Sequence, residues 1–152
     1  MFDANSFLET SVDQSNDTVS IPVPVGEYLA IAEKIEARPW QSKSDPSKAG
    51  MALDILWNID DANVKALLGR DKVTVKQGIM LDVTPEGGLD MGKGKNINLG
   101  RLREACNLNV PGRPFSFRMV EGQMAKVKVT HRLDPNKPDV IYAEIGAVAK
   151  PA

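Results

Sequence analysis

The stretch Met124-Ala125-Lys126-Val127-Lys128-Val129-Thr130-His131-Arg132 alternates apolar and polar residues. Successive side chains of a β-strand point to opposite faces of the sheet, so this alternation predicts a strand within residues 123–133 that has one buried face. The apolar side chains at positions 125, 127 and 129 are expected to point inward. The other face would then be a cationic stripe formed by Lys126, Lys128, Thr130 and Arg132.

The first strand of the folded region is predicted over residues 27–36, where a similar alternation follows a proline-containing lead-in. Residues 39–50 are rich in Pro, Ser and Gly, and we expect them to form a loop. The alternation in the strand divides its side chains between two faces, with Leu29, Ile31 and Ile35 on one face and Tyr28, Ala30, Ala32 and Lys34 on the other.

Further extended segments are expected over residues 51–59, 72–84, 115–119 and 140–148. A short helical turn is predicted over residues 60–69. A longer helix is expected to begin at Asn98, whose side chain can cap its first turn. The apolar stripe of that helix would consist of Leu99, Leu102 and Cys106.

The order of these elements predicts a mainly β protein. Three strands, a helix and two more strands follow one another, which is the chain order of a five-stranded OB-fold-like Greek-key barrel with a helix between strands three and four. The length of 152 residues suits one domain, which we expect over residues 21–150. Residues 1–20 are polar and acidic without sustained periodicity, and are expected to form a flexible N-terminal arm.

Charge is unevenly distributed along the chain, although the total is only −1. Residues 1–19 contain four acidic side chains and no Lys or Arg, whereas residues 91–132 contain nine basic and two acidic side chains. A segment with a net charge of +7 suits a polyanion, because Lys and Arg that neutralise phosphates release counterions. The same pattern also fits a solvated surface whose cations pair with acids elsewhere in the chain.

Motifs for catalysis and for metal binding are missing or incomplete in the sequence. One Cys and one His are too few for a tetrahedral zinc site. Residues 87–94 match a phosphate-binding loop as far as Lys93, but Gly94 stands where a Ser or Thr hydroxyl must reach Mg²⁺. We therefore expect no enzymatic activity and no cofactor, and we interpret this loop as a basic connector.

Binding of a single-stranded nucleic acid requires cations along its backbone and aromatic faces for its bases. Trp40 is the leading candidate for stacking because the predicted loop gives it no core position, and Tyr28 and Tyr142 are expected on outward faces. The aromatic residues that share a face with apolar neighbours are expected in the core: Trp57, Phe115 and Phe117. The predicted cationic contacts are Lys43, Lys72, Lys76, Lys93, Lys95, Arg101, Lys126, Lys128 and Arg132.

Four segments resemble bacteriophage single-stranded-DNA-binding proteins of the OB-fold type, a family long described as of unknown function. These segments are Val25–Tyr28, Leu99–Ala105, Glu121–Val129 and Tyr142–Gly146. The resemblance implies a protein that protects single strands in phage replication or recombination, with single-stranded DNA and proteins of those processes as partners. Many such proteins end in an acidic tail that recruits partners, whereas the acidic stretch of this chain is at its N-terminus.

Two other functions remain open from the sequence: a phage protein-interaction module, such as an inhibitor or adaptor with an acidic protein partner, and a structural component of the virion. The N-terminal residues lack the basic and apolar regions of a secretory signal, and no apolar run approaches the length of a membrane span. We therefore expect a cytoplasmic protein without a membrane partner, in the host cytoplasm if the protein is phage-encoded. The sequence is compatible with a monomer and with a homo-oligomer.

Overall fold

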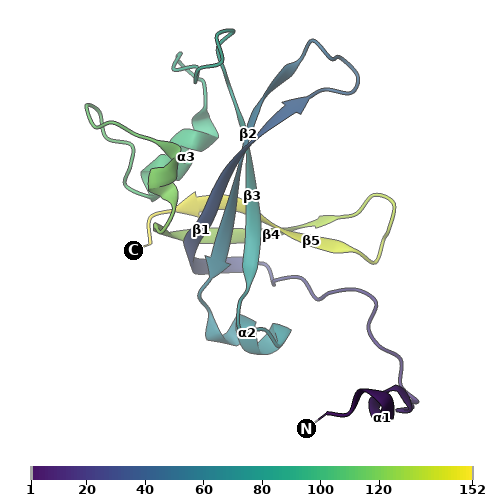
Figure 1. The fold of residues 1–152 in the computed structure, drawn as a ribbon. Coiled ribbons are helices and arrows are strands. Elements are labelled where there is room, and N and C mark those ends of the chain that lie inside the picture. The colour runs from purple at the N-terminus through teal and green to yellow at the C-terminus, as the bar shows by residue number, and fades with distance from the viewer. Residues whose placement is uncertain (1, 152) are drawn as a thin grey trace.

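The computed structural model describes residues 2–151 and contains a five-stranded antiparallel sheet (Figure 1). The strand order across the sheet is β3-β2-β1-β4-β5. The elements in chain order are α1 (Ala4–Leu8), β1 (Gly26–Gln41), β2 (Ala49–Ile59), α2 (Ala62–Leu68), β3 (Thr74–Leu81), α3 (Ile97–Ala105), the 3-10 turn η1 (Phe117–Val120), β4 (Met124–Leu133) and β5 (Ile141–Ala149).

β1 is the longest strand and belongs to both halves of the sheet. Its first residues pair with β4, from Gly26 opposite Val129 to Ile31 opposite Met124. From Ala30 to Gln41, β1 pairs with β2. The β1–β2–β3 part and the β4–β5 hairpin therefore run in different directions and cross at β1 (Figure 1).

The predicted mainly β architecture is confirmed, with five strands and with α3 between β3 and β4. The sheet is antiparallel throughout, and its edges are β3 and β5. Within residues 2–151 these two edge strands are not paired with each other, so the sheet is not closed into a barrel. The edges nevertheless approach each other, because Gly78 of β3 and Ile145 of β5 line the same pocket.

A β-bulge in β1 changes which side chains face the core. The register with β2 shifts between Ala32 and Lys34, so that Ala30 and Ala32 are buried before the bulge and Ile35 after it. The prediction that Leu29 and Ile31 share a face with Ile35 is therefore wrong, and these two side chains are 43% and 38% exposed. An extra residue in one strand reverses the inward positions, and strict alternation cannot anticipate it.

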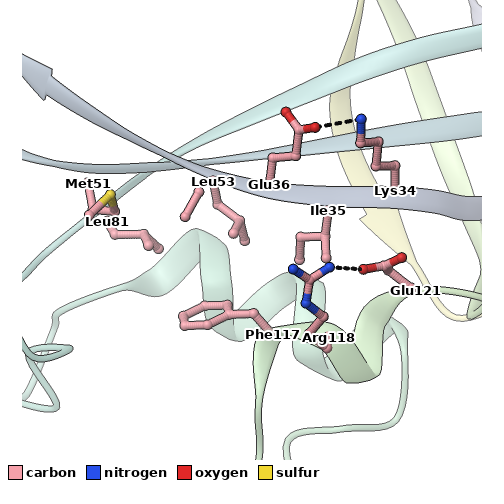
Figure 2. Close-up of a pocket in the computed structure, with 10 residues that line it drawn as sticks. Lys34, Ile35, Glu36, Met51, Leu53, Leu81, Phe117, Arg118 and Glu121 are labelled. Carbon is pink, nitrogen blue, oxygen red and sulfur yellow. Dashed lines mark hydrogen bonds and ion pairs between the residues drawn. The ribbon is translucent and has the colours of Figure 1, made fainter.

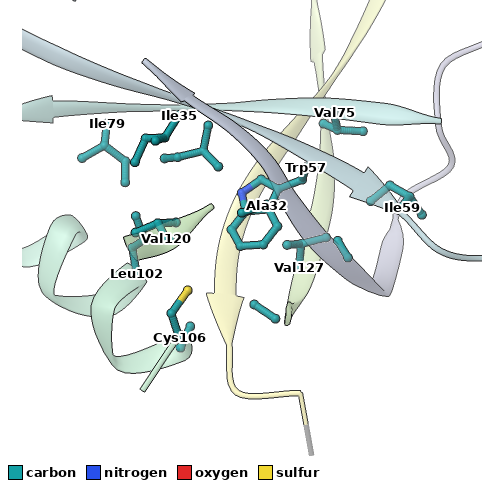
Figure 3. Close-up of a cluster of buried hydrophobic side chains, with 14 of the residues drawn as sticks. Ala32, Ile35, Trp57, Ile59, Val75, Ile79, Leu102, Cys106, Val120 and Val127 are labelled. Carbon is teal, nitrogen blue, oxygen red and sulfur yellow. The ribbon is translucent and has the colours of Figure 1, made fainter. Parts of the chain in front are cut away.

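Trp57 lies at the centre of the core, as predicted (Figure 3). Its indole Nε1 donates a hydrogen bond of 2.8 Å to Oε1 of Gln77, which is the one buried polar side chain in the described chain. The expected inward residues of β4 are fully buried, and those of β3 alternate as predicted. The buried inward side chains of these two strands are Val75, Gln77, Ile79, Leu81, Ala125, Val127 and Val129.

α3 and η1 cover one side of this core (Figure 3). Leu99, Leu102 and Cys106 are buried, which confirms the predicted apolar stripe. The predicted start at Asn98 is wrong. Asn96 precedes α3 instead, with its Oδ1 accepting from Asp82 N and its own N donating to Asp82 Oδ2, both at 2.8 Å, and these bonds fix the start of α3 to the end of β3.

Two other segments differ from their predicted conformation. Residues 115–119 do not form a strand, because Phe117–Val120 is a 3-10 turn in which Phe117 and Val120, three residues apart, both point to the core. The predicted loop 39–50 is also wrong at both ends, since its outer residues belong to β1 and β2. Beyond Ala32, β1 is paired with a strand on one side only, and such an edge tolerates the proline at position 39.

The N-terminal region before β1 contains α1, whose first turn is capped by the Asp3 side chain accepting from Asn5 N. Residues 2–21 are exposed along their whole length. Val23 is the first buried residue, and its carbonyl oxygen lies 2.7 Å from Nε2 of His131 on β4. In the described chain, every helix is too short or too polar to cross a membrane.

Candidate nucleic-acid interface

Side chains from all five strands meet in one groove, which we call the polar groove. It has a volume of about 560 Å³ and lies between the outer face of β1–β2–β3 and the end of the β4–β5 hairpin. The side chains that give it its character are Arg38, Asp54, Lys76, Arg132, Tyr142 and Glu144. Three cations and one aromatic ring thus share a groove with two carboxylates.

The two arginines of the polar groove are held in the same way. Arg38 donates from Nε to Oδ2 of Asp54 at 3.1 Å, and Arg132 donates from Nε to Oε1 of Glu144 at 2.5 Å. Neither terminal amino group of these arginines donates a hydrogen bond to any residue between 2 and 151. Each guanidinium is therefore fixed through one nitrogen and keeps the donor pair that suits a phosphate.

Tyr142 is fixed at the rim of the groove by two neighbours. The guanidinium carbon of Arg132 lies 4.8 Å from the ring centroid, over one face of the ring. The phenol donates a hydrogen bond of 2.7 Å to Oδ2 of Asp134, and this bond raises the pKa of Tyr142 and lowers the pKa of Asp134. Tyr142 is 39% exposed, so part of its ring is accessible to a planar ligand.

Asp54 lies at the floor of the groove, with its side chain 11% exposed. Burial by itself raises the pKa of this carboxyl, but the hydrogen bond from Arg38 and the charges of Lys76 and Arg38 outweigh burial and leave the pKa below its usual value. Lys76 Nζ lies 3.5 Å from Oδ2. The carboxyl is therefore ionised at neutral pH and positions two cations from opposite sides of β2.

Among the predicted contact residues, the structure brings Lys76, Arg132 and Tyr142 together in the polar groove. Arg101 lines an adjoining pocket of about 140 Å³ between β3, β5 and α3, which shares Gly78 and Ile145 with the groove. These four residues come from β3, α3, β4 and β5, so their proximity depends on the fold and not on closeness in sequence.

The other predicted cations lie outside the polar groove. Lys72 is paired with Glu33. Nζ of Lys126 lies 3.9 Å from Oε2 of Glu27, which is on the neighbouring strand β1. Lys128 is on β4 directly opposite Glu27 in the strand register. The remaining three lie in connections, at Lys43 between β1 and β2 and at Lys93 and Lys95 between β3 and α3. The positive segment 91–132 is therefore divided between several surfaces in the folded chain.

Two predicted aromatic contacts occupy other environments than expected. Trp40 is on β1 and not in a loop, and its indole covers Gly50 so closely that a Cβ there would lie 3.0 Å from Nε1. That nitrogen is buried and has no hydrogen-bond partner among residues 2–151. Tyr28 does not face outward, because its ring packs against the core and its phenol donates to Pro24 O at 2.8 Å. Neither residue lines the polar groove.

Arg38, Asp54 and Glu144 were not predicted as site residues, although they organise the groove. Arg38 lies on the extension of β1 beyond the predicted end of that strand at residue 36. Continued alternation through Lys34, Glu36 and Arg38 was the available signal for it. The two acids could not be recognised from sequence, because their role depends on which arginine lies beside them.

A second groove, with a volume of about 540 Å³, lies between η1 and the inner face of β1, β2 and β3 (Figure 2). Its walls combine apolar side chains, among them Met51, Leu53, Leu81 and Phe117, with the charged side chains of Lys34, Glu36, Arg118 and Glu121. Two exposed ion pairs stand at its rim, Lys34 with Glu36 at 2.6 Å and Arg118 with Glu121 at 3.0 Å. We call this the apolar groove, and its chemistry suits an apolar side chain better than a phosphate.

Groups able to perform nucleophilic or metal chemistry are scarce in the described part of the chain. Burial raises the pKa of Cys106 to about 11, so the thiol is protonated at neutral pH. Within residues 2–151, His, Cys, Asp and Glu side chains form no cluster of three that could hold a metal ion.

A scan against protein-family models and a search of curated proteins find no match to this chain.

Proposed function

We propose that the protein binds single-stranded DNA in the polar groove without requiring a defined sequence. The observation that supports this most strongly is the pair of arginines on opposite sides of the groove, each fixed through Nε and each with its terminal amino groups unused. Lys76 supplies a third cation, and Tyr142 supplies a ring for stacking. Cations and an aromatic face are the two requirements of single-strand binding.

The placement of charges suggests how a strand would lie in the groove. Phosphates bind the guanidinium and ammonium groups at the rim, because the carboxylate of Asp54 repels them from the floor of the groove. The bases then point into the groove, where one stacks on Tyr142. The ion pairs of Arg38, Lys76 and Arg132 are more than half exposed on the cation's side, and pairs of this kind cost little to rearrange around a phosphate.

The topology supports the same proposal. The chain order of three strands, a helix and two strands is also that of an OB-fold, which binds oligonucleotides on strands two and three and on the loops after strands one and four. Asp54 of β2 and Lys76 of β3 line the polar groove, so the groove uses the second and third strands, whereas the loops after β1 and β4 are not among its lining residues. We propose that the chain is an OB-fold protein similar to phage single-stranded-DNA-binding proteins and protects single strands in replication or recombination.

The direct test is fluorescence anisotropy with a labelled mixed-sequence oligonucleotide at low salt, with unlabelled single strand and duplex of equal length as competitors. The labelled strand should bind, and the single strand should compete at much lower concentration than the duplex. Absence of binding at tens of micromolar protein, or equal competition by the duplex, would exclude the proposal.

The apolar groove favours a second function, that of a protein-interaction module. The apolar side chains between the charged rims of this groove can receive an apolar side chain from a partner. In that case a specific protein should be recovered with the chain from nuclease-treated extract, and Met51→Asp, which places a charge at a partly buried position of the groove, should prevent recovery. DNA binding would then be weak and independent of strand length.

A further inference from the structure

A carboxylate at the floor of a groove for DNA restricts what can approach it. Asp54 lines both the polar groove and an adjoining pocket on the outer face of β1–β2–β3. Its side chain is 11% exposed, whereas that of Glu144 at the rim is 44% exposed. Because a phosphate at the floor would meet the negative charge of Asp54, a strand bound as proposed above presents a base to this carboxylate.

The two oxygens of Asp54 have different surroundings. Oδ2 accepts from Arg38 Nε at 3.1 Å and lies 3.5 Å from Lys76 Nζ. Oδ1 accepts no hydrogen bond from any residue between 2 and 151, and it lies 3.7 Å from the position that a Cβ at Gly78 would occupy. Since Gly78 has no side chain, the space on the β3 side of Oδ1 is not filled at that position.

An ionised carboxylate can accept hydrogen bonds but cannot donate them. The base edges differ in what they offer to such a group: cytosine has an amino group at N4, whereas thymine has a carbonyl oxygen at O4 in the same position. In a single strand the N3–H of thymine is also free, but it lies between the O4 and O2 acceptors, which repel a carboxylate on both sides. The outer N–H of the cytosine amino group points away from the ring acceptors. A carboxylate therefore binds the cytosine edge more favourably than the thymine edge.

We propose that Asp54 makes the polar groove select bases that present an amino group, so that cytosine is bound in preference to thymine. This rests on the proposed function, because it requires bases to enter the groove. The preference concerns the base that reaches Asp54, and it is compatible with binding of many sequences.

The test compares labelled oligo-dC and oligo-dT of equal length at one salt concentration near neutral pH. The wild-type protein should bind oligo-dC roughly tenfold more tightly than oligo-dT. In Asp54→Asn the side chain has both a donor and an acceptor, so the ratio should fall to about twofold or less. Glu144→Gln is the matched control: it changes the charge of the groove by the same amount and also removes the acid partner of an arginine, but it should keep the preference.

The ratio of the two affinities is measured within each variant, so a general loss of affinity does not imitate the expected result. Equal affinities in the wild type would overturn the role of Asp54 while leaving the proposed function intact. Absence of binding to both oligonucleotides would overturn the proposed function and this inference together. A preference that persists in Asp54→Asn, or that disappears equally in Glu144→Gln, would also overturn the assignment to Asp54.

Discussion

Lys126 and Lys128 belong to the same alternating stripe of β4 as Arg132, yet the three cations end in different surroundings. Arg132 faces the polar groove, where Glu144 fixes its guanidinium and Tyr142 lies beneath it. Lys126 lies beside β1 and faces Glu27. The difference arises because β1 pairs with β4 only up to Val129, and beyond that point β4 continues with β5 alone toward the groove. The neighbouring strand, and not the spacing along the chain, decides what each cation can bind.

The two sets of cations also differ in geometry. The groove holds arginines fixed through Nε, whose planar forks can bind a phosphate through two hydrogen bonds. The stripe beside β1 holds lysines on flexible stems, one of them 3.9 Å from an acid. We therefore expect the groove to account for binding, although the sequence places more charge elsewhere.

The largest expected effect comes from removing the arginines of the groove. Arg38→Gln together with Arg132→Gln should lower the affinity for single-stranded DNA roughly 100-fold, since each arginine loses a charge-assisted contact. Lys126→Gln together with Lys128→Gln removes the same charge outside the groove and should lower the affinity about threefold or less. Anisotropy titrations of both variants measure this comparison. A greater loss in the lysine variant would place the binding surface on the stripe of β4.

A smaller effect is expected from the aromatic ring of the groove. Tyr142→Leu should lower the affinity about tenfold, because stacking of one base contributes roughly 1–3 kcal/mol. Tyr142→Phe should retain most of the affinity. The matched control is Tyr28→Phe, which removes the hydrogen bond to Pro24 O and should reduce the free energy of unfolding by about 1 kcal/mol without changing the affinity. Loss of binding in the Tyr28 variant would contradict the account.

The smallest effect concerns stability and separates the ion pairs of the two regions. Asp54→Asn should reduce the free energy of unfolding by about 1 kcal/mol when measured by urea denaturation near neutral pH, since the Asn side chain can still accept from Arg38 but lacks the charge. Glu27→Gln, which removes the exposed partner of Lys126, should have almost no effect. Equal losses of unfolding free energy in the two variants would show that Asp54 stabilises the fold no more than an exposed surface acid does.

The pH dependence of this stability difference has a definite sign. The pKa of Asp54 is lower in the folded protein than in the unfolded chain, because Arg38 and Lys76 outweigh the effect of burial. Its contribution to stability is therefore present above the unfolded pKa and is lost as the pH falls through the folded pKa. The difference between wild type and Asp54→Asn should remain constant from neutral pH down to about pH 5 and should decrease below about pH 4.

Alternation of residues predicted the segments that form the five strands and the core position of Trp57, and helical spacing predicted the buried stripe of α3, but residues 115–119 were also expected to be extended and instead enter a 3-10 turn. It was insufficient where geometry departs from a regular strand. The bulge after Ala32 reversed the faces of β1, and the one-sided pairing of its second half allowed β1 to continue through Pro39 and Trp40. These features depend on contacts with β2 that the sequence of β1 does not contain.

The candidate site was only partly predictable for the same reason. Lys76, Arg132 and Tyr142 were expected because each is a cation or ring on an outward face. Arg38 was missed because the strand was thought to end before it. Asp54 and Glu144 could not be identified as residues that fix arginines, because those pairs join different strands.

The most direct measurement of the central claim is the salt dependence of DNA binding in three proteins: wild type, the double arginine variant and the double lysine variant. Each phosphate contact on a single strand contributes about −0.7 to the slope of log K against log salt, so three groove cations predict a slope of about −2 for the wild type. The arginine variant should have a slope of about −0.7, and the lysine variant should match the wild type. A slope that is unchanged in the arginine variant and reduced in the lysine variant would contradict binding in the polar groove.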